Sequence, residues 1–189
     1  RTMTKENLKG KSAVVKNLRR KSVFRYALIG QGIIIGVTTG LIIALFRWLL
    51  IFADGCRNRL VAYANTGVGP ALIAALVMLL LVLVIGWILR KEPESTGSGI
   101  PQVEAEMLGK KDMNWLSVLV SKILGCALSI GGGLALGREG PSIQIGAMVG
   151  KGFARTNKRV LTEERYLMSC GAGAGLSAAF GAPLAGTIF

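Results

Sequence analysis

Long uncharged runs dominate the hydrophobic pattern of this chain. Residues 26–46 form a run of 21 residues without a charged side chain, and residues 60–89 form a run of 30. A helix of about 20 apolar residues is long enough to cross the hydrocarbon core of a bilayer. The pattern therefore predicts two membrane-spanning helices, the first reaching past Trp48 and the second covering residues 71–89, with a polar turn region at residues 54–70 between them.

The rest of the chain has shorter apolar segments, which glycine and proline interrupt. The interruptions fall at residues 96–101, 131–133, 137–141, 171–175 and 181–183. Broken helices at membrane depth occur where they are buried in protein or line a water-filled path. Transporters point the N-termini of such helices at their substrates. The pattern predicts an all-α polytopic membrane protein with broken and half-spanning helices in its second half.

Basic residues are concentrated before the first apolar run. The net charge is +13, and residues 1–25 hold nine Lys or Arg residues against one acidic residue, Glu6. A basic flank of this kind indicates the cytoplasmic side of a membrane. Residues 11–25 also mix apolar and basic positions in the manner of a helix that lies on the bilayer surface. We expect a basic cytoplasmic or interfacial segment over 1–25, a transmembrane domain over 26–189, and no nucleic-acid partner.

Two further basic clusters indicate which side of the membrane a segment faces. Arg90 and Lys91 end the second apolar run, and they return the chain to the cytoplasm if the first helix runs outward. Residues 151–165 are also basic, but acidic residues among them leave the side of this segment open.

Some residue types that carry chemistry are absent or scattered. The chain has no histidine, and Cys56, Cys126 and Cys170 do not have metal-ligand spacing. Histidine is the commonest metal ligand, and isolated cysteines in apolar segments are usually buried and inert. We expect no metal site and buried thiols. The chain begins at Arg1 and stops at Phe189 inside an apolar segment, so we also expect it to be a piece of a longer protein.

One carboxylate lies between uncharged segments. Glu139 follows residues 123–137 and precedes residues 143–150, and neither segment has a charged side chain. Charged groups at membrane depth usually face a cavity, a partner or an ion path. Pro141 favours the first turn of a helix, whose free amides would then lie beside Glu139. The segment predicts an anion site with a titratable group next to it.

A second polar site is expected at Ser98. Gly97 and Gly99 flank this serine, and Pro101 indicates the first turn of a helix that runs through Glu106. The hydroxyl can donate a hydrogen bond to an anion, or it can act as an ordinary N-cap for the helix. The sequence does not decide between these two roles.

Small residues in two other segments predict close helix packing. Gly32, Gly36 and Gly40 are spaced four apart in the first apolar run, which lets another helix approach closely. The run Gly171-Ala-Gly-Ala-Gly175 has neither a preceding strand nor an acidic partner about 20 residues on, so packing is a better interpretation than a dinucleotide loop.

Three linked motifs resemble those of the chloride channel/transporter (ClC) family. They are Gly97-Ser-Gly-Ile-Pro101, Gly137-Arg-Glu-Gly-Pro141 and the stretch from Gly171 to Gly186, in the family's order and spacing. The resemblance covers the chain from about Tyr26 onward and matches the N-terminal half of the fold. It implies two inverted repeats, of which this chain would hold the first, and a homodimer with one anion path per subunit.

The resemblance also assigns roles to residues. It implies that Glu139 is the gating glutamate, which competes with chloride and passes protons. It implies anion binding by Ser98, Gly99 and Ile100 at one motif and by Arg138 and Gly140 at the other. Serine at position 98 is similar to chloride-selective members, whereas proline there goes with nitrate preference.

The sequence departs from the family in one place and omits a second group. Gln102 stands where several bacterial members have glutamate. The internal proton-handling glutamate of exchangers would fall just past Phe189.

The leading functional hypothesis is therefore chloride transport by Cl⁻/H⁺ exchange, without a cofactor, in a bacterial-type plasma membrane. A passive voltage- or pH-gated chloride channel of the same fold is the alternative. A remote alternative is a membrane-embedded lipid or phosphate enzyme with Glu139 as its base and Arg138 binding a head group, but the chain lacks the usual acid–base and metal residues.

Overall fold

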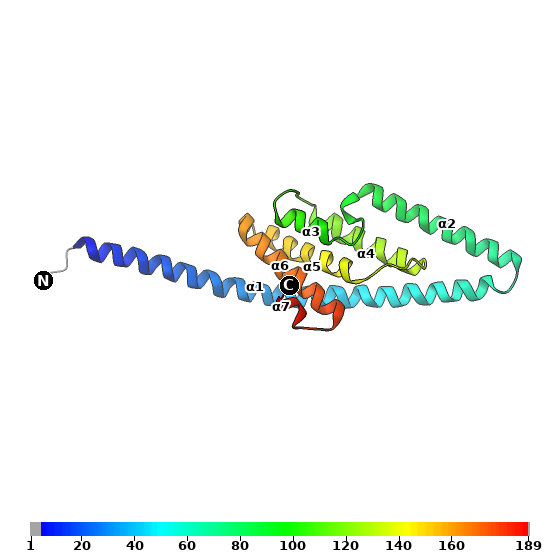
Figure 1. Ribbon diagram of the computed structural model, residues 1–189, viewed down its shortest axis with the longest axis horizontal. Coiled ribbons are helices and arrows are strands. Elements are labelled where there is room, and N and C mark those ends of the chain that lie inside the picture. The colour runs from blue at the N-terminus through cyan, green and yellow to red at the C-terminus, as the bar shows by residue number, and fades with distance from the viewer. Residues whose placement is uncertain (1–4, 189) are drawn as a thin grey trace.

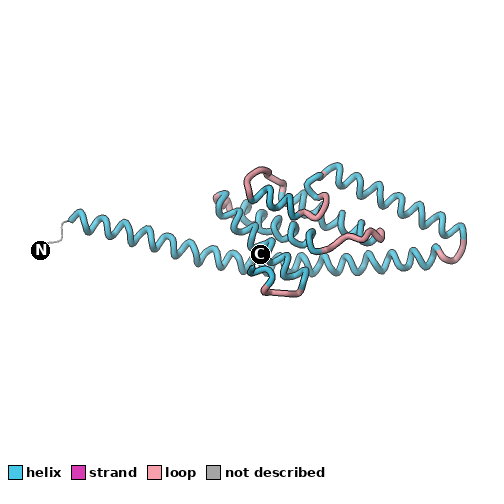
Figure 2. Tube along the Cα trace, in the orientation of Figure 1, coloured by secondary structure: helices cyan, strands magenta, loops and turns pink. Residues whose placement is uncertain are grey.

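The computed structural model describes the backbone of residues 5–188 and the side chains of residues 28–188, and this part of the chain is helical without any strand (Figure 2). The helices are α1 (Lys5–Ala64), α2 (Val68–Lys91), α3 (Ile100–Met107), α4 (Trp115–Gly131), α5 (Glu139–Thr156), α6 (Leu161–Phe180) and α7 (Ala185–Ile188), with a 3₁₀ turn η1 (Pro93–Ser95) before α3. The predicted all-α architecture with short, broken helices in the second half is confirmed.

The two predicted spans are present, and the first is longer than expected. The stretch Leu28–Ala64 of α1 and the whole of α2 are long and apolar enough to cross a membrane. The prediction of a polar turn region at 54–70 is wrong, because α1 continues to Ala64. Asp54 and Arg57 form an ion pair at 3.1 Å one turn apart, and Arg57 also donates to the Ile130 carbonyl, so these polar residues are compatible with a helix.

The N-terminal segment joins α1 without a break in the backbone from Lys5 onward. Its expected position on the bilayer surface depends on side chains outside the described residues.

Helix α5 forms the centre of the packed part of the chain. It lies against α3, α4 and α6, and this group packs on one stretch of α1, while α2 diverges from α1 beyond their connecting turn (Figure 1). All residues from Gly140 to Gly152 are buried. The largest hydrophobic cluster joins α5 to its neighbours through Val103, Val118, Ile143, Met148 and Met168. These buried contacts fix the position of the first turns of α5.

Close backbone contacts join α5 to α6, as predicted for the Gly171–Gly175 run. A methyl group added at Gly146 would overlap the Gly171 carbonyl, and one added at Gly175 would overlap the Ser142 carbonyl. The prediction for α1 is wrong in the described part of the molecule. Gly36 and Gly40 have open space beside them, and Gly32 makes only ordinary contact with Cys170.

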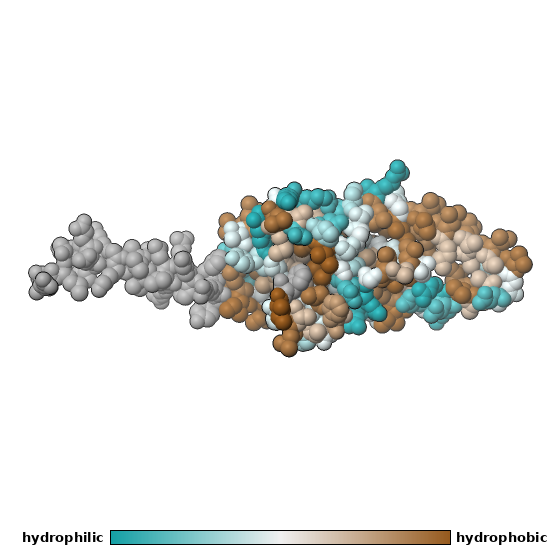
Figure 3. All heavy atoms as spheres, in the orientation of Figure 1, coloured by the Kyte–Doolittle hydropathy of each residue, from teal (hydrophilic) through white to brown (hydrophobic). Residues whose placement is uncertain are grey.

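Apolar side chains cover much of the outer surface of α1 and α2 (Figure 3). Leu41, Ile51, Leu72 and Leu83 are each more than 60% exposed, which suits a surface that faces lipid. The cysteines are all free. Cys126 is buried as expected, but Cys56 and Cys170 are exposed.

Candidate anion site at two helix N-termini

The first motif lies at the start of α5. Arg138 is the N-cap residue, Glu139 is the first helical residue, and Pro141 lies in the first turn, as predicted. The first amides of a helix have no partner inside it, and Pro141 has none to offer. The amides of Glu139 and Gly140 are thus available to a ligand at the positive end of the helix dipole. Glu139 and Arg138 are exposed, whereas Gly140 is buried.

The second motif lies at the start of α3. The N-cap residue is Gly99, in the left-handed conformation at φ 88°, and Ile100 and Pro101 begin the helix. The N-cap role considered for Ser98 is therefore wrong, because the chain turns one residue later, where glycine tolerates the positive φ. No side chain caps this helix. The Ser98 hydroxyl is left exposed and free to donate to a ligand.

The two motifs are in direct contact. A methyl group added at Gly140 would lie 2.6 Å from the Ser98 carbonyl oxygen and 2.9 Å from the Ser98 Cβ atom. Gly99 is equally close to Gln144 of α5, since a methyl there would lie 2.6 Å from Gln144 Cδ. Only glycine permits either approach. The structure thus brings Ser98, 41 residues earlier in the chain, beside the helix start that carries Glu139.

Side chains from three helices bind the carbonyl groups of residues 94–97. The amide of Gln144 donates to the Glu94 carbonyl at 2.9 Å, and Gln102 donates to the Thr96 carbonyl at 3.1 Å. Lys122 of α4 donates to the carbonyls of Ser95 and Gly97, at 3.0 and 2.8 Å. Carbonyl oxygens repel anions, so a loop that carries an anion site benefits when its carbonyls are all engaged elsewhere.

Lys122 is the residue that the sequence interpretation missed. Its side chain is 1% exposed, and its two hydrogen-bond partners are neutral carbonyls. The signal was a lone charge in the apolar stretch 116–137, which indicates function in a membrane protein. The hydrogen bond to Thr96 also explains the glutamine at position 102, where the family resemblance leads us to expect glutamate. A carboxylate could not donate a hydrogen bond to the Thr96 carbonyl.

The structure places all the predicted site residues at one edge of the packed helices. Ser98 and Gly99 directly precede α3, which begins at Ile100, and Arg138 directly precedes Glu139 and Gly140 at the start of α5. Gly99 and Gly140 are buried where the two helix starts meet, and the other four are exposed. Two converging helix N-termini with a hydroxyl and a carboxylate can bind a small anion without a fixed cation in contact with it. The fold and this arrangement are those expected of a polytopic α-helical membrane protein.

Comparison with known proteins narrows this class. The model of the voltage gated chloride channel family matches residues 81–189. The H(+)/Cl(-) exchange transporter ClcA of Citrobacter koseri is 34% identical over 179 residues, which are 93% of this chain and 38% of that protein. ClcA of Salmonella schwarzengrund is 34% identical over 178 residues. A slow cyanobacterial Cl⁻/H⁺ antiporter of known crystal structure has a TM-score of 0.78 and 35% identity, and the match covers 84% of this chain and 38% of that one.

The chain belongs to the voltage gated chloride channel (ClC) family. It spans about two fifths of the length of the relatives that it matches. These relatives are named as transporters and none as an enzyme, so the lipid or phosphate enzyme considered above has no support among them.

Proposed function

We propose that this chain provides the first half of a chloride pathway, and that the complete protein exchanges chloride for protons. Ser98 and the amides at the starts of α3 and α5 bind the anion. Glu139 occupies the same place when it is ionised and leaves when it is protonated, so it carries protons and gates chloride.

The contact between Ser98 and Gly140 carries this proposal. It brings Ser98 and the N-termini of α3 and α5 together, and Glu139 is the first residue of α5. Backbone amides bind an anion more weakly than a fixed cation in contact would, and this weakness lets the ion leave as well as enter. The names of the similar exchangers support protons as the coupled ion.

The positions of charged residues support an orientation with the N-terminus in the cytoplasm. Glu94 follows the basic end of α2 and pairs with Lys111 at 2.6 Å, and Asp112 pairs with Lys151 at 2.8 Å. The end of α2 and the segment 151–165 both lie away from the turn that joins α1 to α2 (Figure 1). By the positive-inside rule both belong to the cytoplasmic side. The homodimer implied by the family resemblance stays a prediction.

Flux measurements on the full-length gene product in liposomes test the proposed function. An outward chloride gradient imposed at equal pH should drive protons inward through an exchanger. Chloride flux without proton movement would identify a passive channel of the same fold. If neither chloride nor protons move above the rate of protein-free liposomes, the proposal is wrong.

Lys122 offers a prediction about the anion site itself. Lys122→Met should weaken chloride binding by about tenfold or more, because hydrogen bonds from a charged donor are worth about 1.5–3 kcal/mol and the Ser95 and Gly97 carbonyls lose theirs. Titration calorimetry measures the affinity. Lys122→Arg keeps a charged donor and should bind more tightly than Lys122→Met, and Lys110→Met removes an exposed lysine as a control. Equal affinity in Lys122→Met and wild type would contradict the role given to this residue.

A further inference from the structure

Helix α3 is a short element with few anchors. It has eight residues, and only Val103 and Glu106 of these are buried. Isolated helices of this length are not stable in water, so packing decides where α3 lies. Val103 belongs to the main hydrophobic cluster and is three residues from both Ile100 and Glu106. The position of its N-terminus, which belongs to the proposed anion site, therefore depends on what holds Glu106.

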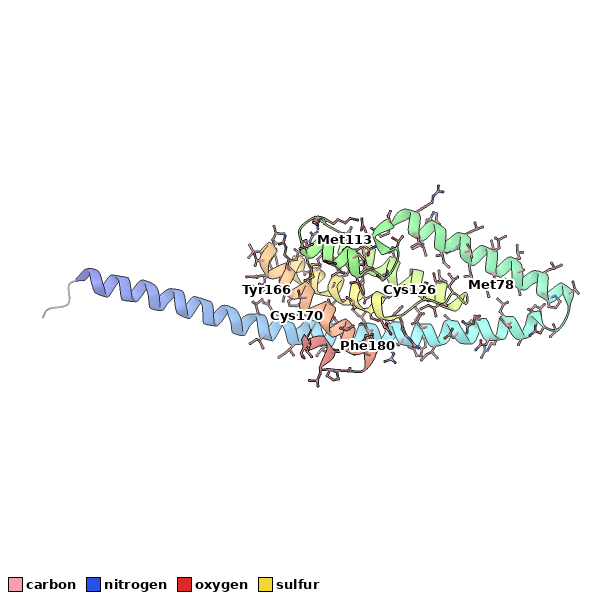
Figure 4. All side chains as sticks on the ribbon, viewed as in Figure 1. Met78, Met113, Cys126, Tyr166, Cys170 and Phe180 are labelled. Carbon is pink, nitrogen blue, oxygen red and sulfur yellow. The ribbon has the colours of Figure 1, made fainter. Side chains whose placement is uncertain are left out.

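Lys151 of α5 binds Glu106. Its Nζ atom contacts Glu106 Oε1, and it also donates to Asp112 Oδ1 at 2.8 Å and to the Met113 carbonyl at 2.5 Å. The side chains of Lys151 and Glu106 are 0% and 5% exposed. Met113 lies beside α3 in Figure 4. All three protons of the ammonium group thus have acceptors, which fixes its position.

The surroundings of the pair are charged and come from three elements. Arg155 of α5 contacts Asp112 of the α3–α4 connection and lies 3.6 Å from Glu164 of α6. The carboxylates of Glu106, Asp112 and Glu164 lie within 4.8 Å of one another, and Lys151 and Arg155 supply the opposing charge. This cluster connects the C-terminal end of α3 to α5 and α6.

We propose that the Lys151–Glu106 pair is a positioning clamp for the anion site. Helices α3 and α5 meet at two places, at their starts through Gly99, Ser98 and Gly140 and near their ends through this pair. Contact at both places makes the helices run side by side in the same direction. The clamp sets the direction in which the first amides of α3 point, although neither of its residues touches the anion.

Because α3 is short, a movement at Glu106 is transmitted to Ile100 at the other end of the helix. With a rise of about 1.5 Å per residue, Ile100 and Glu106 lie about 4.5 Å on either side of Val103. If α3 pivots at Val103, a shift of about 1 Å at Glu106 produces a shift of similar size at Ile100. Amides that bind an ion must be placed to within about 0.5 Å, so a shift of this size weakens binding. The inference rests on the proposed function, because it concerns the same anion site.

Three variants of the full-length gene product test the clamp. Glu106→Gln keeps the shape of the side chain and weakens the pair. Glu106→Leu combined with Lys151→Met removes the pair without leaving a buried charge, a replacement that often preserves folding. Arg159→Gln disrupts an ion pair with Glu163 that does not involve α3 and serves as the control. Chloride affinity is measured by titration calorimetry, and the mobility of α3 by hydrogen exchange of the peptide that covers residues 98–108.

We expect faster exchange in α3 and chloride binding weakened by about tenfold in both clamp variants, in the range seen for residues that act on a site from a distance. The control should match wild type in both measurements. Faster exchange with unchanged chloride affinity would show that the pair only stabilises the fold, and unchanged exchange would show that it does not hold α3. Either result overturns the inference. Hydrogen exchange needs no chloride, so it still decides whether the clamp exists if the wild type binds no anion and the proposed function fails.

Discussion

Glu139→Gln should abolish proton transport and leave chloride flux intact. The glutamine side chain has nearly the same shape as the glutamate side chain, but it cannot release and rebind a proton. Loss of a proton-transfer group typically costs about 100-fold or more in rate. In the proposed mechanism chloride is bound by the Ser98 hydroxyl and the helix amides, which this substitution leaves in place. The test is the ratio of protons to chloride ions transported, obtained by measuring both fluxes together in liposomes.

Asp54→Asn is a suitable control for this experiment. It removes a carboxylate from a membrane helix outside the candidate site, where Asp54 pairs with Arg57. This variant should keep the wild-type ratio of protons to chloride. If the Glu139→Gln protein still moved protons against their gradient, the coupling mechanism proposed for Glu139 would have to be abandoned.

Gly146→Ala should severely destabilise the packed helices. The added methyl group would overlap the backbone carbonyl of Gly171, and a backbone cannot move aside as the end of a side chain can. Overpacking a core costs about 1–3 kcal/mol, and we expect about 3 kcal/mol or more here because the methyl group would displace the backbone of α6. The shift in unfolding temperature can be followed in detergent by tryptophan fluorescence.

Gly125→Ala provides the matched comparison. Gly125 is also buried and helical, but nothing lies within 4 Å of the place that its methyl group would take. Alanine in a helix interior is favoured over glycine by about 0.5–1 kcal/mol, so this variant should be as stable as wild type or more stable. Equal destabilisation by the two substitutions would mean that the α5–α6 contact does not cause the destabilisation by Gly146→Ala.

Local signals predicted some features of the fold well. Pro141 indicated the start of α5 to within two residues, because proline in a first turn gives up no hydrogen bond. The second apolar run became α2, with Arg90 and Lys91 in its last turn as expected. The end of α1 was missed, since the ion pair between Asp54 and Arg57 makes a polar segment compatible with a helix.

Features that depend on tertiary contact could not be predicted in the same way. The spacing of Gly36 and Gly40 matches that of Gly146 and Gly150, yet only the second pair meets another helix. Spacing shows that a close approach is possible and does not show which helix approaches. Likewise, Lys122 was missed although it is a lone charge in an apolar stretch, because its carbonyl partners lie 25 and 27 residues away in the chain.

The glycine contacts between α5 and α6 restrict how a gate at Glu139 can work. Ser142 meets Gly175, Gly146 meets Gly171 and Gly150 meets Leu167, so the two helices touch backbone to backbone once in each successive turn. Such a pair has no side chains between its backbones that could rearrange to let one helix slide. The motion left to Glu139 is rotation of its own exposed side chain, which takes picoseconds to nanoseconds. The arrival of ions and protons, rather than this rotation, would then set the rate of opening.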